Sequence, residues 1–403
     1  MIVEPYILFI RIPIIKHDNG QVFTDPLWAK DLKLHLDYIE NFGICCPVEE
    51  SNNTEGLVDV TDIGIKWIFE LKVDHGLGSI LKNLIPNFSV VRKACQQAKV
   101  VHSDGGGWAF PLSFYLLVLK PFMSFRWVIV IESSFWMLGQ GERRTFRKVV
   151  EHYVNKVLLT RCVKLADVRI FTQSFYRKYF LGDERSRTFI NPATWVDKGN
   201  AATREMVERR FESKTDHVVK ILFPSRLIAD KGVLIVLAAI KELQAVDIEV
   251  SITIMGFGEL KEECERFAKH SYGGVRVEFQ QPVDYGEKFF DVVAKYDWLL
   301  IPTLKQEQPR VIFDAFSQGV PVIGSDTSGI MDITNKDNAF TFETGNPSSL
   351  AEVISHVARN PRLSLEMGLA GLEYAAGKTH LQMHQDRELF LKEGLKYVNN
   401  PWP

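Results

Sequence analysis

Two basic residues follow a predicted buried strand in the segment PSRLIADKG. The strand ends at Pro224 and a helix should begin near Gly232, so Arg226 and Lys231 are expected at the carboxyl end of the strand, beside a helix N-terminus. Arginine can hold a phosphate through two parallel hydrogen bonds and lysine acts as a point charge, so this pair suits a diphosphate. The alternative is a solvated loop with two incidental cations, and this segment alone does not separate the two interpretations.

Two acidic residues accompany the next informative helix. A predicted strand runs into Pro302, a loop follows, and Pro309 is expected in the first turn of a helix. Glu307 then lies just ahead of this helix and Asp314 lies within it. Carboxylates at this place can accept hydrogen bonds from sugar hydroxyls, and free helix amides can bind phosphate. Each acid taken alone is more simply a capping or exposed residue, but that interpretation explains the ordered set less well.

A glycine pair lies in the segment MGFGELKEE, between a predicted strand and a helix. Gly256 and Gly258 lack side chains, so the backbone there can approach a ligand closely. We therefore consider both as candidates for contact with a nucleotide. A lone Gly-x-Gly also occurs in tight strand–helix turns that bind nothing.

The N-terminal half offers polar residues at two predicted strand ends. His102 and Asp104 end a buried strand in VVHSDGGGWAF, and Gly105 and Gly106 follow them. The next predicted strand ends at Glu132. A lone histidine in such a strand is more often a structural residue whose hydrogen bonds are satisfied, although the acid and the glycines beside it favour a functional role.

Short apolar runs alternate with amphipathic stretches throughout the chain. Most of these runs lack polar alternation, which is typical of strands buried on both faces, and the alternation with helices predicts parallel sheets. The expected strands are Tyr6–Ile10, Lys99–His102, Trp127–Ile131 and Val168–Thr172 in the first half, and Lys220–Pro224, Glu249–Met255, Val275–Phe279, Trp298–Ile301 and Pro321–Gly324 in the second.

The chain has 403 residues, and one hydrophobic core rarely exceeds roughly 250–300 residues, so we expect two domains. A charge-dense stretch, Asp197 to His217, is interpreted as the linker. The predicted fold is α/β, with two doubly wound Rossmann-like domains and a central cleft, spanning residues 1–197 and 198–380. Ligands in such folds bind at the carboxyl ends of the strands.

Composition excludes several classes of protein. The net charge of -2 does not indicate a nucleic-acid partner. The five cysteines include no CxxC pair and predict neither a disulfide framework nor a zinc site, which favours the cytoplasm. The N-terminus is expected to be a first strand rather than a signal peptide, and no run reaches the ~18 apolar residues of a membrane span.

The second half resembles the donor domain of glycosyltransferase family 4, a retaining family with the GT-B fold. The resemblance runs in order through PSRLIADKG, MGFGE, VEFQQPV, LLIPTLKQEQPRVIFDAFSQGVPVIGSD and SGIMD. It implies that Arg226 and Lys231 contact the donor diphosphate and that Glu307 and Asp314 hold the donor sugar and ribose. It further implies a sugar or phosphate contact for the amides near Arg310 and Val311, and a place beside the base for Phe279–Gln281, and so for Gln281.

The sequence departs from the family pattern at the acidic pair. Members usually carry two glutamates eight positions apart, whereas here the second acid is Asp314 and the residue eight positions before it is Gln306. Glu307 is one position late, and we favour it over Gln306 as the functional residue.

The first half matches the family less well. Members usually carry a glycine-rich loop after the first strand, where this chain offers only Asn19 and Gly20. We expect these two residues on the acceptor side, together with Asp104, Gly105 and Gly106 farther along the chain. Many also carry a histidine near the position of Glu132. The resemblance implies catalytic roles for Glu307, His102 and Glu132. It also implies that a C-terminal helix, 381–397, packs back onto the N-terminal domain.

The function implied by the resemblance is the transfer of a sugar from a nucleoside diphosphate sugar to a glycan, a lipid-linked sugar or a small molecule, in surface polysaccharide synthesis. Family members usually need no metal, and the chain lacks an Asp-x-Asp motif, so no cofactor is expected.

Two alternatives to this function stay open. One is another GT-B enzyme, such as an epimerase or a phosphorylase, although no pyridoxal-phosphate lysine signature is recognised. The other is a non-catalytic partner subunit.

One stretch is rich in basic residues. Eight Lys or Arg residues lie between Gln140 and Arg169, against three acids. Together with the apolar segments Trp108–Leu119 and Phe135–Leu138 they could dock on an anionic membrane, which would place the protein peripherally at the inner face. A solvated helix face over an ordinary core is the slightly favoured alternative.

Overall fold

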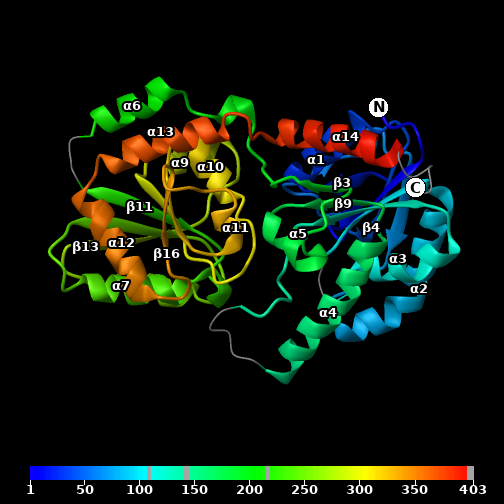
Figure 1. The fold of residues 1–403 in the computed structure, drawn as a ribbon, viewed down its shortest axis with the longest axis horizontal. Helices are drawn as coiled ribbons and strands as arrows, with labels where there is room; N and C mark the ends of the chain where they lie inside the picture. Colours follow the sequence, from blue (N-terminus) through cyan, green and yellow to red (C-terminus); the bar gives the residue numbers. More distant parts are fainter. Residues whose placement is uncertain (107–109, 140–144, 215–217, 397–403) are drawn as a thin grey trace. The chain divides into compact units, whose positions relative to one another are not determined.

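The computed structural model describes residues 1–106, 110–139, 145–214 and 218–396, which form two compact units (Figure 1). Unit 1 comprises Met1–Ser133, Val150–Pro192 and Met383–Pro403, and unit 2 comprises Ser134–Val149 and Ala193–Gln382. The division differs from the expected 1–197 and 198–380, because segment 134–149 belongs to unit 2. Hydrogen bonds explain this: Ser134 Oγ donates to the Gln306 carbonyl (3.1 Å) and Lys305 Nζ donates to the Met137 carbonyl (3.0 Å).

Unit 1 is built on a sheet with the strand order β10-β9-β8-β7-β1-β4-β2-β3-β5, and β6 also pairs with β4. The pairs β2–β3 and β3–β5 are antiparallel, and the others are parallel. The strands are β1 (Tyr6–Phe9), β2 (Ile14–Lys16), β3 (Val22–Thr24), β4 (Phe42–Glu50), β5 (Val58–Asp59), β6 (Trp67–Leu71), β7 (Val100–Asp104), β8 (Arg126–Ile131), β9 (Val168–Phe171) and β10 (Thr188–Ile190).

Helices cover this sheet, with α1 and α14 on one face and α2, α3 and α4 on the other (Figure 1). They are α1 (Pro26–Leu36), α2 (Leu77–Gln97), α3 (Leu112–Leu119), α4 (Phe146–Leu165), α5 (Ser174–Leu181) and α14 (His380–Lys396), with the 3-10 turn η1 (Lys120–Phe122). Local sequence explains where α1 begins: the Asp25 side chain accepts hydrogen bonds from two amides of the first turn, and Pro26 fits that turn.

Unit 2 contains a parallel six-stranded sheet of order β13-β12-β11-β14-β15-β16. Its strands are β11 (Val219–Pro224), β12 (Val250–Met255), β13 (Val275–Gln280), β14 (Trp298–Ile301), β15 (Val322–Ser325) and β16 (Ala339–Phe342). Its helices are α6 (Arg204–Glu212), α7 (Val233–Leu243), α8 (Lys261–Phe267), α9 (Glu287–Val293), α10 (Val311–Ser317), α11 (Ser328–Met331), α12 (Pro347–Arg359) and α13 (Leu363–Ala375), with 3-10 turns η2 (Lys198–Asn200) and η3 (Ala229–Lys231).

The strand order of unit 2 reverses direction between β11 and β14. The chain moves outward from β11 to β13 on one side and from β14 to β16 on the other. Both faces are buried: Ile221 and Phe223 of β11 belong to one core cluster, and Leu222 between them belongs to another. Ligands of doubly wound sheets bind at the carboxyl ends of the strands beside such a reversal. The loops that follow β11 and β14 are therefore the first place to look for a site.

The stretch interpreted as a linker contains helix α6, which packs onto unit 2. Val207 of α6 is buried, and a Cβ on Gly319 would lie 2.4 Å from its side chain. Gly319 also has φ +64°, a backbone conformation that suits the residue just after a helix, and its missing side chain makes room for α6. Residues 215–217 of the expected linker lie outside the described residues.

Helix α14 is attached to α1 by a buried polar network. His384 Nε2 lies 3.0 Å from Asp31 Oδ1, and His384 Nδ1 lies 3.4 Å from the Tyr38 hydroxyl. The His35 ring lies 4.7 Å from the His384 ring, centroid to centroid. Burial lowers the pKa of His384 to about 3, although the bond to Asp31 opposes this effect. The predicted C-terminal helix thus packs on unit 1 from Met383 onward.

No helix in the described ranges has both the length and the apolar content of a membrane span.

His384 should make the protein acid-sensitive. Its pKa is about 3 when folded and near 6.5 when unfolded, so below about pH 6.5 only the unfolded chain takes up the proton. The free energy of unfolding should therefore fall by up to about 1.4 kcal/mol per pH unit as the pH drops from 6.5. Urea unfolding at pH 7.5, 6.5 and 5.5 measures this slope. We expect a shallower slope for His384→Gln. Equal slopes would contradict a folded-state pKa of about 3 for His384.

Candidate active site

The loop after β11 is fastened to the loop after β12 by backbone hydrogen bonds. Leu227 N donates to the Phe257 carbonyl (2.7 Å), and Leu260 N donates to the Leu227 carbonyl (2.9 Å). A Cβ on Gly256 would lie 1.8 Å from the Ser225 carbonyl oxygen, and one on Gly258 would lie 2.5 Å from that of Leu227. These glycines allow the two loops to pack closely, so close backbone packing requires a glycine at both positions.

Gly232 holds the loop after β11 against the loop after β14. It has φ +77°, and a Cβ there would lie 1.9 Å from the Pro302 carbonyl oxygen. Leu304 N donates to the Asp230 carbonyl (2.9 Å). The two loops are therefore in direct backbone contact at the strand reversal.

A side-chain ion pair joins the same two loops. Lys231 Nζ donates to Glu307 Oε1, and both side chains are partly exposed. The sequence predicted these residues for diphosphate and sugar respectively, without predicting their contact. Asp230 and Lys305 form a second, looser pair, with 3.8 Å between Oδ2 and Nζ.

Arg226 lies in the same loop with its side chain exposed, and no ion pair to it is found among the described residues. The site therefore combines one free guanidinium with a lysine that a carboxylate partly neutralises. A diphosphate carries two or more negative charges and would fit beside both cations.

The structure distinguishes Gln306 from Glu307. Gln306 Oε1 accepts hydrogen bonds from Ser328 N (2.8 Å) and Ser328 Oγ (2.6 Å), so this side chain fastens the loop to α11. A Cβ on Gly329 would lie 1.9 Å from the Glu307 carbonyl oxygen, which brings the backbone of α11 onto the same loop. The carboxylate of Glu307 instead contacts Lys231, and its functional role stays a prediction.

Asp314 lies on α10 and is buried. It accepts a hydrogen bond from the Tyr285 hydroxyl (2.7 Å). Burial raises the pKa of Asp314 to about 7, and the Tyr285 hydrogen bond and the nearby Arg310 charge oppose this rise. The raised pKa brings protonation of Asp314 toward neutral pH, and in its protonated form the carboxyl group can donate as well as accept hydrogen bonds.

Arg310 is the residue before α10, and its guanidinium lies 5.0 Å from the centre of the Trp195 ring. Val311 begins the helix and is half-buried. Gln281 follows β13 and is exposed. Sequence reasoning missed Tyr285 and Trp195, because no motif marks residues that come into contact only through the fold.

The residues predicted in unit 1 fall into two groups. Asp104 ends β7 and Glu132 follows β8, and these parallel strands are neighbours in the sheet. Burial raises the pKa of Asp104 to about 7, and the Glu132 charge raises it further while Arg11 opposes the rise. Gly105 leaves space for Ile131, because a Cβ there would lie 1.8 Å from the Ile131 side chain, whereas a Cβ on Gly106 would meet only ordinary contacts. Asp104 and Glu132 thus share one edge of the sheet.

His102 does not reach that edge. It lies within β7, is 3% exposed, and its Nδ1 lies 2.8 Å from the Tyr6 hydroxyl. Burial holds the pKa of His102 well below its usual value, so it is neutral. The catalytic prediction for His102 is thus corrected, because β7 is buried on both faces up to Ser103 and His102 lies before its partly exposed end.

Asn19 and Gly20 form the turn of a β-hairpin between β2 and β3. Gly20 has φ +88°, and Asn19 Nδ2 donates to Gln21 Oε1 (2.6 Å). Both residues are exposed. An ordered hairpin therefore stands where family 4 members usually carry a glycine-rich loop, and the acceptor contact of its tip stays a prediction.

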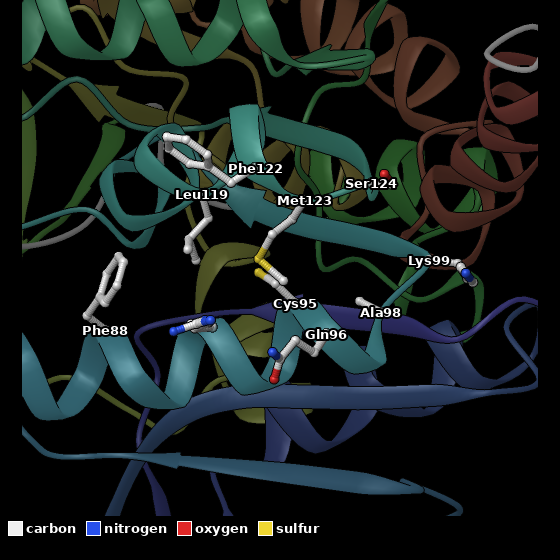
Figure 2. A pocket seen from close by; sticks show the side chains of 10 residues that line it. Phe88, Cys95, Gln96, Ala98, Lys99, Leu119, Phe122, Met123 and Ser124 are labelled. Carbon is white, nitrogen blue, oxygen red and sulfur yellow. The ribbon is translucent and has the colours of Figure 1, made fainter.

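Unit 1 also holds a pocket of about 530 Å³, which Figure 2 shows. Its lining includes Arg92 and Cys95 of α2, Lys99, and Phe122 and Met123 beyond α3. Lys99 and the residues after Phe122 immediately precede β7 and β8, so the pocket lies at the amino-terminal edge of these strands. Asp104 and Glu132 lie at the opposite edge, and the pocket is not part of the candidate site.

Asp31, His35 and His384 form a group whose ligand atoms lie within 4.8 Å of one another. Two imidazoles and a carboxylate are a ligand set that suits a divalent transition metal. All three residues are buried, and hydrogen bonds already connect them. Sequence spacing could not show this group, because His384 is far from the other two along the chain.

Solved structures that resemble this chain share its fold. The crystal structure of the Anabaena protein HepE with UDP and glucose is 15% identical, covers 96% of this chain and 99% of its own, and has a TM-score of 0.65. Sucrose-phosphate synthase from Thermosynechococcus elongatus is 13% identical with 98% of each chain covered and a TM-score of 0.69. A candidate UDP-N-acetylglucosamine 2-epimerase from Listeria monocytogenes is 14% identical, covers 99% of this chain and 98% of its own, and has a TM-score of 0.61.

The comparison that decides the class of activity is with protein families. The model for glycosyl transferases group 1 matches residues 218–360, which include the loops of Arg226, Lys231 and Glu307. The chain is a transferase of the GT-B glycosyltransferase superfamily. No curated protein matches its sequence. The expected α/β fold with two Rossmann-like domains is confirmed.

Gly232 should be irreplaceable in this transferase. Alanine would require a left-handed backbone and would place its Cβ against the Pro302 carbonyl, so we expect Gly232→Ala to lower the free energy of unfolding by roughly 1–3 kcal/mol. Gly199→Ala is the matched control, since a Cβ at Gly199 meets nothing within 4 Å. Equal urea midpoints for the two variants would contradict the loop contact.

Tyr285 should set the protonation of Asp314. Its hydrogen bond lowers the pKa of Asp314, so Tyr285→Phe should raise this pKa above 7. A carbon-13 NMR titration of labelled aspartate carboxyl groups measures the change. Tyr374→Phe, at a half-buried tyrosine elsewhere in unit 2, should leave the Asp314 titration unchanged. An unaltered titration in Tyr285→Phe would show that the hydrogen bond has no effect on the carboxyl group.

Proposed function

We propose that the chain is a retaining glycosyltransferase of family 4, which transfers a sugar from a nucleoside diphosphate sugar to a glycan, a lipid-linked sugar or a small molecule. We further propose that it acts in the cytoplasm, in surface polysaccharide synthesis. The observation that carries the proposal is the Lys231–Glu307 ion pair at the strand reversal of unit 2, beside Arg226, whose side chain is exposed. UDP is the first nucleotide to test, because the similar HepE structure contains UDP and glucose.

The reaction can be written for the residues of unit 2. The bond between the anomeric carbon and the diphosphate breaks, and the charge that develops on the diphosphate is held by Arg226 and Lys231. Glu307 then exchanges its contact with Lys231 for contact with sugar hydroxyls. The acceptor oxygen attacks from the face that the diphosphate leaves, and its proton passes to a departing phosphate oxygen. The configuration at the anomeric carbon is thereby retained.

The other residues have supporting roles in this proposal. Asp314, near its pKa, holds the ribose hydroxyls with the help of Tyr285, and Gln281 lies beside the base. On unit 1, Asp104 and Glu132 are the candidates for contact with the acceptor or the donor sugar. We propose that no metal is needed, because two side-chain cations are available for the diphosphate.

The match to group 1 glycosyl transferases favours transfer over epimerisation, although one similar structure is a candidate epimerase. The two activities differ in their products. A transferase joins the sugar to an acceptor, whereas an epimerase returns an altered sugar nucleotide without one. Product analysis by mass spectrometry and proton NMR separates them and also reports the anomeric configuration.

Nucleotide binding tests the donor site. We expect one of UDP, GDP, dTDP and ADP, or a sugar derivative, to raise the melting temperature with EDTA present, since ligand at 100 times its Kd adds about 2.7 kcal/mol. Arg226→Ala should weaken this binding roughly 10- to 100-fold through loss of charge-assisted hydrogen bonds. Arg209→Ala, at an exposed arginine of α6, is the matched control. Absence of binding to every nucleotide would overturn the donor-site assignment.

Turnover tests the role of Glu307. Glu307→Gln should lower kcat about 10²- to 10³-fold while leaving nucleotide binding close to that of the wild type, because the change removes electrostatic stabilisation rather than a diphosphate contact. Glu352→Gln on the exposed face of α12 serves as the control. Full activity in Glu307→Gln would exclude this residue from catalysis. Nucleotide binding without transfer in the wild type would favour a non-catalytic subunit.

A further inference from the structure

Helix α4 carries apolar side chains on two opposite faces. Leu159, Cys162 and Val163 are buried, and Cys162 Sγ lies 3.5 Å from the Ser113 carbonyl oxygen of α3. This face attaches α4 to unit 1. Figure 1 shows the N-terminal half of the helix extending past the strands of that unit.

The opposite face is an exposed apolar stripe, formed by Val150, Tyr153, Val154 and Val157. At about 100° per residue these positions fall within an arc of ~100°, and their side chains are between 43% and 59% exposed. Phe146, one turn before Val150, continues the stripe and is 87% exposed. The face of a surface helix that points away from the core is ordinarily polar, so the core of unit 1 does not explain these residues.

Most basic residues of α4 lie in or beside the stripe, whereas Lys148 lies on the opposite side of the helix. The helix contains Arg147, Lys148, Lys156, Arg161 and Lys164 against a single acid, Glu151. All five basic residues are exposed, and Arg161 and Lys164 continue the line of the stripe toward the C-terminal end. Lys156 Nζ lies 5.4 Å from the centre of the Tyr179 ring.

The apolar segments Trp108–Leu119 and Phe135–Leu138, which the sequence offers as candidates for membrane docking, are mostly buried among the described residues. Most of α3, in the expected Trp108–Leu119 run, is buried, and residues 107–109 lie outside the described residues. Trp136 and Met137 are buried as well. The exposed apolar residues that accompany the basic stretch are those of α4 itself.

Charge identifies the partner. Two copies of α4 placed stripe to stripe would bring ten cations together with only two acids, which opposes self-association. An anionic bilayer offers the complementary charge, and each basic residue near such a surface strengthens binding. We propose that α4 lies in the plane of an anionic lipid bilayer, with its stripe among the acyl chains just below the headgroups and its basic residues at the lipid phosphates.

The test is binding to vesicles without any sugar nucleotide, so its result does not depend on the proposed function. We expect the full chain to co-sediment with vesicles that contain phosphatidylglycerol and phosphatidylcholine, and to be released from them by salt. Little binding is expected to pure phosphatidylcholine vesicles. The triple variant Val150→Ser, Val154→Ser, Val157→Ser should bind the anionic vesicles at least about tenfold more weakly. The double variant Lys156→Gln, Arg161→Gln should lose about tenfold as well.

Matched controls distinguish binding through the stripe from non-specific binding to the vesicles. The variant Leu389→Ser removes another exposed apolar residue, on α14. The double variant Lys82→Gln, Lys93→Gln removes two exposed charges on α2. Both variants should bind the anionic vesicles like the wild type. All the substituted side chains are exposed, so circular dichroism should show an unchanged fold. Equal binding by the triple variant and the wild type, or no binding of the wild type to anionic vesicles, would overturn the proposal. It would also be overturned if sedimentation without lipid showed a dimer that the triple variant abolishes, because the stripe would then be an interface between copies.

Discussion

The parallel pairing of β11 with β14 is the constraint on which the candidate site depends. These two strands are neighbours, with Ile221 opposite Trp298, although β12 and β13 separate them in the chain. Because the connections that leave them cover opposite sides of the sheet, their carboxyl ends form the place where two loops meet. The close approach at Gly232, the Lys231–Glu307 pair and the position of α10 all follow from that pairing.

Buried polar groups have different surroundings in the two units. In unit 1, His102, His35 and His384 are buried beside Tyr6, Tyr38 and Asp31, where hydrogen bonds replace solvent and fix α14 on α1. In unit 2, Asp314 is buried next to an exposed loop and keeps a pKa near 7. The first arrangement stabilises the fold. The second leaves a titratable group at the edge of the sheet, which is typical of a functional site.

Helix α4 shows how one element can meet two requirements. Its inner face satisfies the core of unit 1, while its outer face carries apolar and basic residues that this core does not need. A transferase with a lipid-linked acceptor would gain from such a face, because binding to the membrane raises the local concentration of the acceptor.

The sequence by itself determined the strands with uninterrupted apolar runs, because burial on both faces leaves a pattern that needs no partner to be recognised. The strands expected from such runs are present as β1, β7, β8, β9 and β11–β15, each within two residues of the expected bounds. It missed β4, whose nine residues include Pro47 and two cysteines, as well as the short strands β2, β3, β5, β6, β10 and β16. The ordered motifs also located Arg226, Lys231, Glu307 and Asp314. Only the tertiary structure decided that Lys231 meets Glu307, that Gln306 binds Ser328 and that Tyr285 caps Asp314, because these contacts join residues from separate loops. It also decided that His102 is buried, because elements distant in the sequence cover both faces of β7.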